Sequence, residues 1–399
     1  MPTTSKNQKT PPIDISDILS KKADAYLIYG DIHNADLFYA THFLMSDPFS
    51  YILTASGDEV LLIPDMEKGR AQKESRVSDK NIKTTSDYNY RSLVKEKKDT
   101  NLAYALVLKA ALTEKKIKTV AVGYDFPAYY FNALQKEGLN VVLMKNVFEK
   151  SRAVKTEDEV SKIEESQKAA EKAMAAAILM IQNSIVENDT KRLLHNGLVL
   201  TGEMVLNEIA RVLTENNCLD EETIVSCGED SADPHGKTYG ELHTQKPIVI
   251  DIFPKNKQTR YFGDMTRTVI KGKATPKLMK MYEAVKTAQA IGVSKAKAGV
   301  TCTDVHNAVC DSLEKSGFET YRSGSKVGFI HTTGHGVGLD IHETPSVSDN
   351  PHVLEAGNVI TIEPGLYYPG IGGIRIEDTV VITKDGCQNL NKMEKVFEI

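Results

Sequence analysis

The chain has 399 residues, of which 41% are hydrophobic and 26% are charged, and its net charge at pH 7 is −5. This length exceeds one typical domain and favours two. The acidic balance leaves no excess of cations for phosphates, which argues against nucleic acid as the main partner, and no apolar run approaches the ~18 residues needed to span a bilayer.

The N-terminal residues 1–12 are polar, and we expect a disordered tail there. They lack the apolar segment of a signal peptide, so export is not indicated. The five cysteines are odd in number and show no CxxC spacing. We therefore expect free thiols in a reducing compartment. Both features predict a cytoplasmic protein.

The first part of the chain predicts an α/β domain over residues 13–153. Apolar runs bounded by turn residues predict strands at 25–30, 50–55, 59–64, 118–125 and 140–144. A helical pattern over 127–138 connects the last two of these strands. The segment 67–100 is charged and weakly periodic, so we expect helix and loop there. This domain carries no obvious catalytic constellation.

The pattern changes near Val154, where a second domain, 154–399, is predicted to begin. Thr156 and Glu159 form a capping-box pattern ahead of a long helix that ends near Gln182. Further helices are expected to follow three start signals, which are Thr201, Thr275–Pro276 and a Thr303 cap whose helix ends near Gly317. Gly-rich turns then alternate with short strands over 327–384. This order favours an α+β fold with polar residues projecting from a curved sheet.

Two carboxylates stand inside apolar strand patterns within PIVIDIFPKNKQTRYFGDMTRT, residues 247–268. The pattern predicts a β-hairpin in which Asp251 pairs directly with Asp264 and residues 255–260 form the loop. Opposed side chains lie about 4.5–5.5 Å apart at Cβ, so two buried carboxylates there repel unless protons or cations lie between them. Two divalent ions roughly 3.5–4 Å apart would suit this gap. Taken alone, the hairpin is interpreted more simply as two solvated aspartates on a polar face.

Three more side chains of metal-binding type follow. His335 stands in GHGVG, where flanking glycines leave the imidazole uncrowded. Glu363 follows ITI and Glu377 follows IRI, and these neighbours predict buried strand positions. Four buried carboxylates and an imidazole in one domain would be strongly destabilising without cations. Oxygen-rich ligation with one histidine favours Mn²⁺, with Fe²⁺, Co²⁺ or Zn²⁺ as alternatives.

This array resembles the dinuclear metallopeptidases with the pita-bread fold, among them methionine aminopeptidase, aminopeptidase P and prolidase. Their pattern is an Asp on one strand, the Asp of D-x-T-R-T on the next, a GHG-type His, an EPG Glu and a final R-x-E Glu. Over roughly residues 150–399 it reads here as Asp251, Asp264 in DMTRT, His335 in HTTGHGVG, Glu363 in IEPG and Glu377 in RIED. The resemblance implies a pita-bread catalytic domain that binds two divalent ions through these five residues.

The resemblance also implies how such a site would work. A hydroxide bridging the two ions would attack the scissile carbonyl, and Glu363 would act as the proton shuttle. His331 and His342 correspond to histidines that hydrogen-bond the substrate or the tetrahedral intermediate. For either histidine, a structural role is an equal alternative.

Two further residues correspond to substrate-binding positions of the family. His235, in DPHG, matches a histidine that contacts substrate. Arg375, two residues before Glu377, resembles an arginine that steadies the site or a substrate carboxylate. A surface or structural role is an equal alternative for each. Tyr367 and His243 are interpreted as structural.

The N-terminal 150 residues resemble the creatinase-like domain of prolidase and aminopeptidase P in size and α/β pattern. Methionine aminopeptidases generally lack such a domain, so the resemblance favours hydrolysis of an Xaa-Pro bond, by a dipeptidase or an aminopeptidase, and a homodimer. One departure concerns the hairpin. Asp251 and Asp264 are two residues farther apart than in the family, and DIFP replaces D-x-G. We expect the extra residues at the hairpin tip, near the rim of the substrate site.

Other chemistries fit the sequence less well. HETPS is not the HExxH of zinc proteases, no GxSxG is present, and GHGVGL lacks the strand–helix context of a dinucleotide fingerprint. Two alternatives are a creatinase-like amidinohydrolase, which shares both domains but lacks the metal ligands, and a catalytically inactive binding protein on the same fold. The metal content of the purified protein would separate both from a peptidase.

Overall fold

The computed structural model describes residues 15–19, 22–145 and 147–399, so the predicted tail at 1–12 lies outside the described residues. The chain divides into two compact units, one ending at Lys150 and one spanning Ser151–Ile399. Each unit has hydrophobic clusters of its own. Among the described residues, no helix is both long and apolar enough to cross a membrane.

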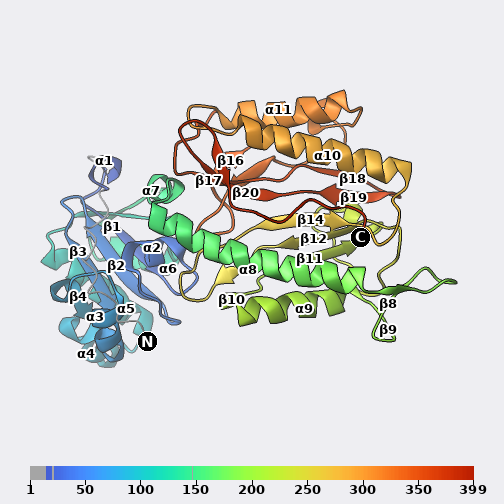
Figure 1. Cartoon of the computed structure of the whole chain (residues 1–399). Coiled ribbons are helices and arrows are strands. Elements are labelled where there is room, and N and C mark those ends of the chain that lie inside the picture. The colour runs from blue at the N-terminus through green and yellow to red at the C-terminus, as the bar shows by residue number, and fades with distance from the viewer. Residues whose placement is uncertain (1–14, 20–21, 146) are drawn as a thin grey trace. The chain divides into compact units, whose positions relative to one another are not determined.

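The first unit is built on a six-stranded mixed sheet (Figure 1). Its strands are β1 Ala25–Gly30, β2 Phe49–Thr54, β3 Glu59–Ile63, β4 Ile82–Thr84, β5 Thr119–Val122 and β6 Asn140–Leu143. They lie in the order β4-β3-β2-β1-β5-β6. The prediction of helix and loop throughout 67–100 is wrong at β4, which pairs in parallel with β3 at the sheet edge. Three residues are too few for an alternating pattern to show in the sequence.

Helices cover both faces of this sheet. They are α1 Ser16–Leu19, α2 Ala35–Thr41, α3 Lys68–Glu74, α4 Tyr90–Lys97, α5 Thr100–Glu114 and α6 Ala128–Lys136, and α7 Glu149–Ala153 follows β6. Ala25 and Leu27 of β1 share a hydrophobic cluster with α5 and α6, whereas Tyr26 and Ile28 cluster with α2 and α3. Since successive strand residues point to opposite faces, the strand is buried on both sides and reads as a continuous apolar run.

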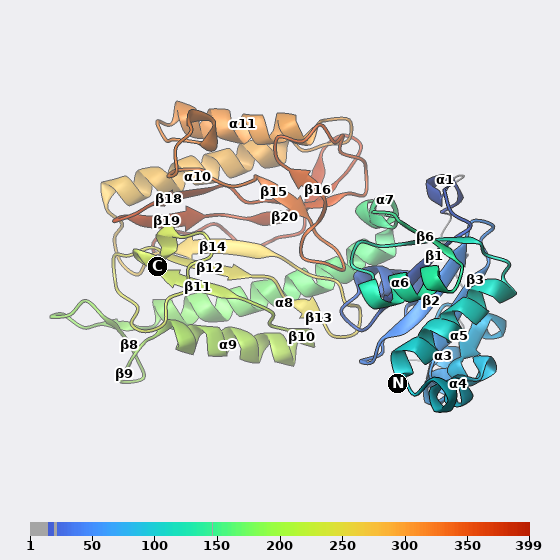
Figure 2. The same cartoon turned by 180° about the vertical axis from the view of Figure 1, so that it is seen from behind.

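The second unit places most of its strands between two pairs of helices, as Figure 1 and the reverse view in Figure 2 show, whereas β8 Leu193–His195 and β9 Leu198–Val199 project beyond the helices. The helices are α8 Glu157–Gln182, α9 Gly202–Glu215, α10 Pro276–Lys295 and α11 Cys302–Lys315. The capping box of Thr156 and Glu159 begins α8, and Thr201 and Thr275 cap α9 and α10 as predicted. Short 3₁₀ turns are η1 Asp65–Glu67, η2 Asp79–Asn81, η3 Thr85–Tyr88, η4 Asp230–Ala232 and η5 Tyr321–Ser323.

The predicted cap of the last helix is wrong by two residues. The hydroxyl of Thr301, not that of Thr303, accepts a hydrogen bond from the backbone N–H of Asp304 at 3.0 Å. Thr301 has the extended backbone typical of an N-cap, whereas Thr303 already lies inside α11. The sequence offered two threonines two positions apart, and the earlier one is the N-cap.

The strands of the second unit form several small sheets. A three-stranded sheet, in the order β11-β12-β14, contains β11 Ile224–Cys227, β12 Ile248–Ile252 and β14 Met265–Val269. A five-stranded sheet, in the order β16-β15-β17-β20-β21, contains β15 Gly334–Gly336, β16 Glu343–Val347, β17 Val359–Ile362, β20 Asp378–Ile382 and β21 Cys387–Asn389. The smaller sheets pair β18 Gly365–Tyr368 with β19 Gly372–Arg375, β10 Cys218–Leu219 with β13 Lys255–Asn256, and β7 Ile185–Val186 and β9 Leu198–Val199 with β8 Leu193–His195.

The central hairpin forms, but in a register two residues away from the predicted one. Asp251 pairs with Thr266, not with Asp264. The ladder continues through a bridge between Lys255 and Phe262, so the reversal is confined to 257–260. Lys255 was assigned to the loop but belongs to β13, which pairs with β10. Because the shift is an even number of residues, the two carboxylates still face the same side.

Candidate metal centre

The five predicted metal-binding residues come from separate elements of the second unit. Asp251 lies in β12, Asp264 directly precedes β14, and His335 is the middle residue of β15. Glu363 stands between β17 and β18, and Glu377 stands between β19 and β20. The fold therefore carries residues up to 126 positions apart in the sequence into one region of the unit.

The sequence predicted that both glutamates lie inside strands, and this prediction is wrong. Each lies in a two-residue connection between two strands. At each connection the chain leaves the five-stranded sheet for the β18–β19 pair, or returns from it. Pro364 has no N–H for a ladder, which explains the break after Glu363. The backbone N–H of Glu363 donates to Thr333 O at 2.8 Å, and that of Glu377 donates to Thr266 O at 3.1 Å. Each glutamate is thus fixed by a neighbouring segment.

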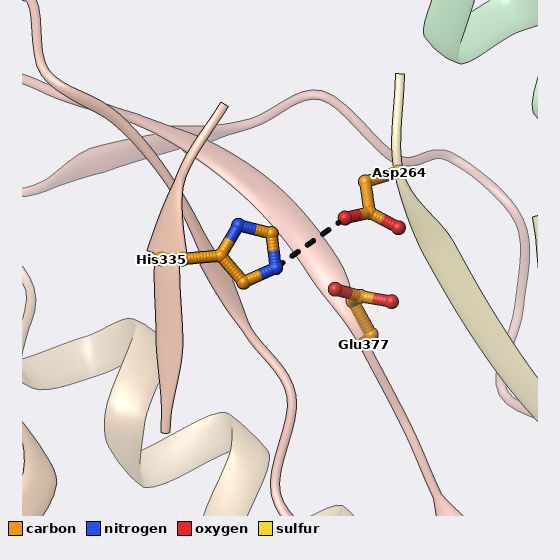
Figure 3. Close-up of side chains that lie close together, drawn as sticks. All are labelled: Asp264, His335 and Glu377. Carbon is orange, nitrogen blue, oxygen red and sulfur yellow. Dashed lines mark ion pairs between the residues drawn. The ribbon is translucent and has the colours of Figure 1, made fainter. Parts of the chain in front are cut away.

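Asp264, His335 and Glu377 converge with one ligand atom each within 4.8 Å of the others (Figure 3). His335 Nε2 lies 3.6 Å from Asp264 Oδ2 and 3.4 Å from Glu363 Oε1. The guanidinium of Arg375 donates to Asp251 Oδ2 at 2.8 Å. Asp251 Oδ1 is buried and has no hydrogen-bond partner among the residues that the structure describes.

The electrostatics of this cluster are unfavourable without a cation. Burial raises the pKa of Asp264 and that of Glu377 well above their ordinary values, and neighbouring carboxylates raise both further. Burial, helped by the charge of Asp251, raises the pKa of Glu363 to about 8. Burial and the nearby His342 lower the pKa of His335 to about 4. A neutral imidazole surrounded by carboxylates that resist ionisation is the expected state of an empty ligand set.

The donor atoms fit a metal pair. His335 Nδ1 lies 3.2 Å from the carbonyl oxygen of Gly336, so the neutral ring carries its proton there. Its Nε2 lone pair then faces the oxygens of Asp264 and Glu363. Together with the buried Asp251 Oδ1, these acceptors form a place where bound cations, or protons in their absence, relieve the repulsion. Carboxylates with a single imidazole suit Mn²⁺ and similar ions.

Arg375, Tyr367 and His331 form a hydrogen-bonded chain beside the cluster. Arg375 donates to Tyr367 Oη at 2.8 Å, and Tyr367 Oη lies 3.0 Å from His331 Nε2. His331 Nδ1 is 2.7 Å from the carbonyl oxygen of Thr332, which only a donated N–H can satisfy. Nε2 therefore accepts from Tyr367. Burial, with the positive charge of Arg375, lowers the pKa of His331 to about 3.

Sequence reasoning treated Tyr367 as structural and missed this link. Gly365 leaves space for this tyrosine, because the hydroxyl of Tyr367 would lie 2.3 Å from a Cβ at Gly365. His342 packs its ring edge-to-face on His335, with centroids 4.4 Å apart. His235 is exposed, and its charge acts on both His331 and His342. These side chains surround the candidate metal centre.

Three uncharged residues that the sequence analysis did not identify support the ligands. Thr266 Oγ1 donates to Glu377 Oε2 at 2.7 Å, and the side-chain oxygen of Gln167 accepts from the backbone N–H of Asp264 at 2.8 Å. Thr361 Oγ1 accepts from the backbone N–H of His335 at 3.1 Å. Only Thr266 lies within a recognised motif, DMTRT; Gln167 stands in the middle of α8 and has no local signal. His243, also interpreted as structural, is partly exposed beside Glu241.

Two family models match the chain. Residues 17–154 match the creatinase/prolidase N-terminal domain, and residues 161–384 match metallopeptidase family M24. The second match alone covers more than half of the chain. This chain belongs to metallopeptidase family M24. Metallopeptidases of this family typically hold two metal ions.

Relatives and solved structures agree with this assignment. A Xaa-Pro dipeptidase of Pyrococcus horikoshii is 31% identical over 350 residues, covering 86% of this chain and 87% of the relative. The prolidase structure from Pyrococcus horikoshii OT3 has a TM-score of 0.76 at 28% identity and covers 96% of this chain and 98% of its own. The X-Pro aminopeptidase structure from Thermotoga maritima has a TM-score of 0.78 at 25% identity, with 97% and 100% covered. The predicted fold, a creatinase-like α/β domain followed by a pita-bread catalytic domain, is confirmed.

Proposed function

We propose that this M24 metallopeptidase hydrolyses Xaa-Pro peptide bonds, as a dipeptidase or an aminopeptidase acting on proline-containing peptides. The observation that carries a metal-dependent hydrolysis is the convergence of Asp264, His335 and Glu377, because their ligand atoms lie within 4.8 Å of one another and could share a cation. Similarity to an Xaa-Pro dipeptidase over 86% of the chain supports the choice of bond. A homodimer and a cytoplasmic location stay predictions from the sequence.

The five residues Asp251, Asp264, His335, Glu363 and Glu377 are proposed to hold two divalent ions, with Mn²⁺ favoured over Fe²⁺, Co²⁺ and Zn²⁺. When bound, such a pair supplies an activated water and polarises the scissile carbonyl. The protein's own part is to hold these acceptors close together before the ions arrive. Thr266 and Gln167 do this by fixing Glu377 and Asp264 through side-chain hydrogen bonds.

Glu363 is the proposed proton shuttle. In the metal-free protein, burial raises the pKa of Glu363 to about 8, and the positive charge of bound ions would lower that pKa again. Its side chain is 15% exposed, the largest value among Asp264, Glu363 and Glu377, and it therefore has room for a water. A general base needs such access as well as a suitable pKa.

The histidines and Arg375 are proposed to bind substrate around this shuttle. His342 packs against His335, from where it would donate a hydrogen bond to the oxyanion of the tetrahedral intermediate. His331 would have to exchange its bond with Tyr367 to contact substrate, because both of its ring nitrogens have partners. His235 is exposed and would contact the outer part of the peptide. Arg375 would steady Asp251.

Metal dependence is tested at Asp264, whose carboxylate converges with His335 and Glu377. Asp264→Ala should abolish peptidase activity and bound metal together, measured by metal analysis of the purified protein. Asp189→Ala, an exposed aspartate of the same unit, is the control and should change neither. Full activity of Asp264→Ala without bound metal would contradict the dinuclear mechanism. A metal-free but folded wild-type protein would favour the binding-protein or amidinohydrolase alternative.

Substrate choice is tested with a peptide panel. Ala-Pro should be hydrolysed faster than Ala-Ala or Met-Ala, and Ala-Pro compared with Ala-Pro-Ala separates a dipeptidase from an aminopeptidase. A selective pocket typically contributes only ~1–3 kcal/mol in the transition state, so a ratio of about 10–200 is sufficient evidence. Equal rates on all dipeptides, or a preference for N-terminal Met on longer peptides, would move the assignment to a general or methionine aminopeptidase.

A further inference from the structure

The loop that carries His342 is closed by one carboxylate, that of the next residue, Glu343. The Glu343 side chain is 5% exposed, and its Oε1 accepts hydrogen bonds from the backbone N–H groups of Leu339 at 2.8 Å and Asp340 at 3.0 Å. Gly338 lies against the same group, because a Cβ there would stand 2.4 Å from Glu343 Oε2. The carboxylate therefore acts as the centre of a tight loop over 338–343.

Two cations from the start of the second unit hold this carboxylate. Lys155 Nζ donates to Glu343 Oε2 at 2.9 Å, and the Lys155 side chain is 1% exposed. Arg152 donates to Glu343 Oε1 and, at 2.7 Å, to Asp340 Oδ2. Burial by itself raises the pKa of Glu343, but Lys155 and Arg152 hold that pKa below its ordinary value. Glu343 is accordingly an anion at neutral pH.

The segment that provides the cations is anchored independently of the loop. The backbone N–H of Lys155 donates to Gly357 O at 2.8 Å, and the Asn358 side chain donates to Ala153 O at 3.0 Å. On its other side, the loop is tied to the central hairpin, since the N–H of Phe262 donates to Gly338 O at 2.8 Å. The loop thus connects two fixed parts of the catalytic unit, one of which is two residues from Asp264.

We propose that Glu343, held by Arg152 and Lys155, is a positioning residue that fixes the His342 ring against His335. This inference rests on the proposed function, in which His342 stabilises the tetrahedral intermediate. Stability alone is a weak reason for such a cluster, because buried ion pairs replaced by well-packed apolar groups are often neutral or stabilising. Holding the neighbouring His342 in place does require the ion pairs at Glu343 in this geometry. A displacement of a catalytic group by about 1 Å can lower the rate about 10²-fold.

The variant Glu343→Gln tests the proposal, because it keeps an oxygen for the two backbone N–H groups and removes the charge that holds Arg152 and Lys155. We expect kcat on Ala-Pro to fall about 10–10²-fold, with KM and bound metal changed less than about twofold. Lys155→Met, which removes one cation, should give a smaller loss of the same kind. The control is Glu59→Gln, which removes a comparably buried ion pair in the first unit. There Arg76 Nη2 lies 3.2 Å from Glu59 Oε2, and the two side chains are 6% and 7% exposed. This variant should leave kcat unchanged.

A double variant shows whether Glu343 acts through His342. If it does, Glu343→Gln should cause no further loss in a His342→Ala background, whereas independent effects would multiply. Histidine ring signals in ¹⁵N NMR give a readout that needs no turnover. The His342 signals, assigned from His342→Ala, should shift in Glu343→Gln and not in Glu59→Gln.

Each result decides between the two proposals. Unshifted His342 signals, or losses that multiply in the double variant, would overturn the positioning role. A wild-type protein that does not cleave Ala-Pro, but whose His342 signals shift in Glu343→Gln, would overturn the proposed function and leave the positioning role standing.

Discussion

Glu363 and Glu377 have different surroundings, although both lie at a break between two strands. Glu377 is 2% exposed, and its carboxylate is fixed by Thr266, which itself accepts from Arg375 Nε at 3.2 Å. Glu363 is more exposed and faces His335. A rigid, enclosed carboxylate suits a plain ligand, whereas an accessible one suits a ligand that also exchanges protons. The two residues should therefore respond differently to the same substitution.

Glutamine distinguishes these roles, because its carbonyl oxygen can still ligate weakly but cannot take up a proton at neutral pH. Under saturating Mn²⁺, Glu363→Gln should lose about 10²–10⁴-fold in kcat while still binding metal and substrate. Glu377→Gln should fail mainly through metal affinity and recover partly as metal is added. The measurement is kcat against Mn²⁺ concentration for both variants. Recovery of Glu363→Gln alone would show that the roles are reversed.

At the scale of single residues, most of the candidate ligands could be proposed from the sequence, because they stand in short motifs such as GHG, EPG or RIED. It could not identify the residues that hold them. Gln167 reaches Asp264 across 97 positions and Thr361 reaches His335 across 26. Their function depends on which backbone atom the fold brings beside them, and an uncharged polar residue in a helix or strand gives no pattern for that.

At the scale of secondary-structure elements, the packing of the central hairpin against α8 determines the position of Asp264. Gly263 lies so close to the helix that a Cβ would meet the backbone N of Gln167 at 2.6 Å and the backbone C of Ser166 at 2.7 Å. Ser166 Oγ also donates to Tyr261 O at 2.8 Å. The hairpin and α8 are therefore in backbone contact at the residue before Asp264. An added Cβ at Gly263 would meet backbone atoms, which cannot move aside as a flexible side chain could.

Gly263→Ala should push the hairpin away from α8. We expect a loss of about 1–3 kcal/mol in the free energy of unfolding, as is typical of overpacking, together with weaker metal binding because Asp264 is the next residue. Urea denaturation and metal titration measure the two effects. Gly69→Ala, in α3 with nothing within 4 Å of the added Cβ, is the control and should be neutral or stabilising. Equal behaviour of the two variants would contradict the packing argument.

Elements were predictable where the signal is local. The caps of α8, α9 and α10 and the runs of β1 and β3 contain their own start and stop residues. The register of the hairpin was not predictable in this way, because it involves pairing with a distant strand. Lys255 pairs with β10 and bridges Phe262, which leaves only 257–260 for the turn. Likewise, the break at Glu363 follows from the passage of the chain between two sheets, which only the assembled fold reveals.

The molecule as a whole must accommodate several acidic groups in one place. Outside the centre, buried acids have strong partners, as Asp378 has in Arg267 at 2.9 Å and in Lys395, and the pKa of Asp378 stays below its ordinary value despite burial. In the centre, the pKa values of Asp264, Glu363 and Glu377 are raised instead. The stability of the metal-free protein should therefore depend on pH in a way that the metal-loaded protein does not share.

The sign of this dependence follows from proton linkage. A carboxyl group whose pKa is raised on folding keeps protons that the unfolded chain releases, so stability falls as pH rises toward the folded pKa, which is about 8 for Glu363. His331 and His335, with pKa values lowered to about 3 and about 4, act oppositely, but only below their ordinary value of 6.5. Between about pH 6.5 and 8, the pH dependence of stability that arises from this centre therefore comes from its carboxyl groups and not from these two histidines.

We therefore expect EDTA-treated protein to lose stability from pH 6.5 to 8, by up to about 2 kcal/mol for each such group, since one pKa unit corresponds to about 1.36 kcal/mol. Urea denaturation at several pH values measures this loss. Glu363→Gln should show a shallower slope, because its amide has no proton to release. Added Mn²⁺ should stabilise the wild-type protein most at the upper end of the range, where fewer protons compete with the ion for the carboxylates. Stability of the EDTA-treated protein that rises across this interval would mean that the carboxyl groups of the centre are ionised without metal, and that Asp264, Glu363 and Glu377 do not form a cation-dependent site.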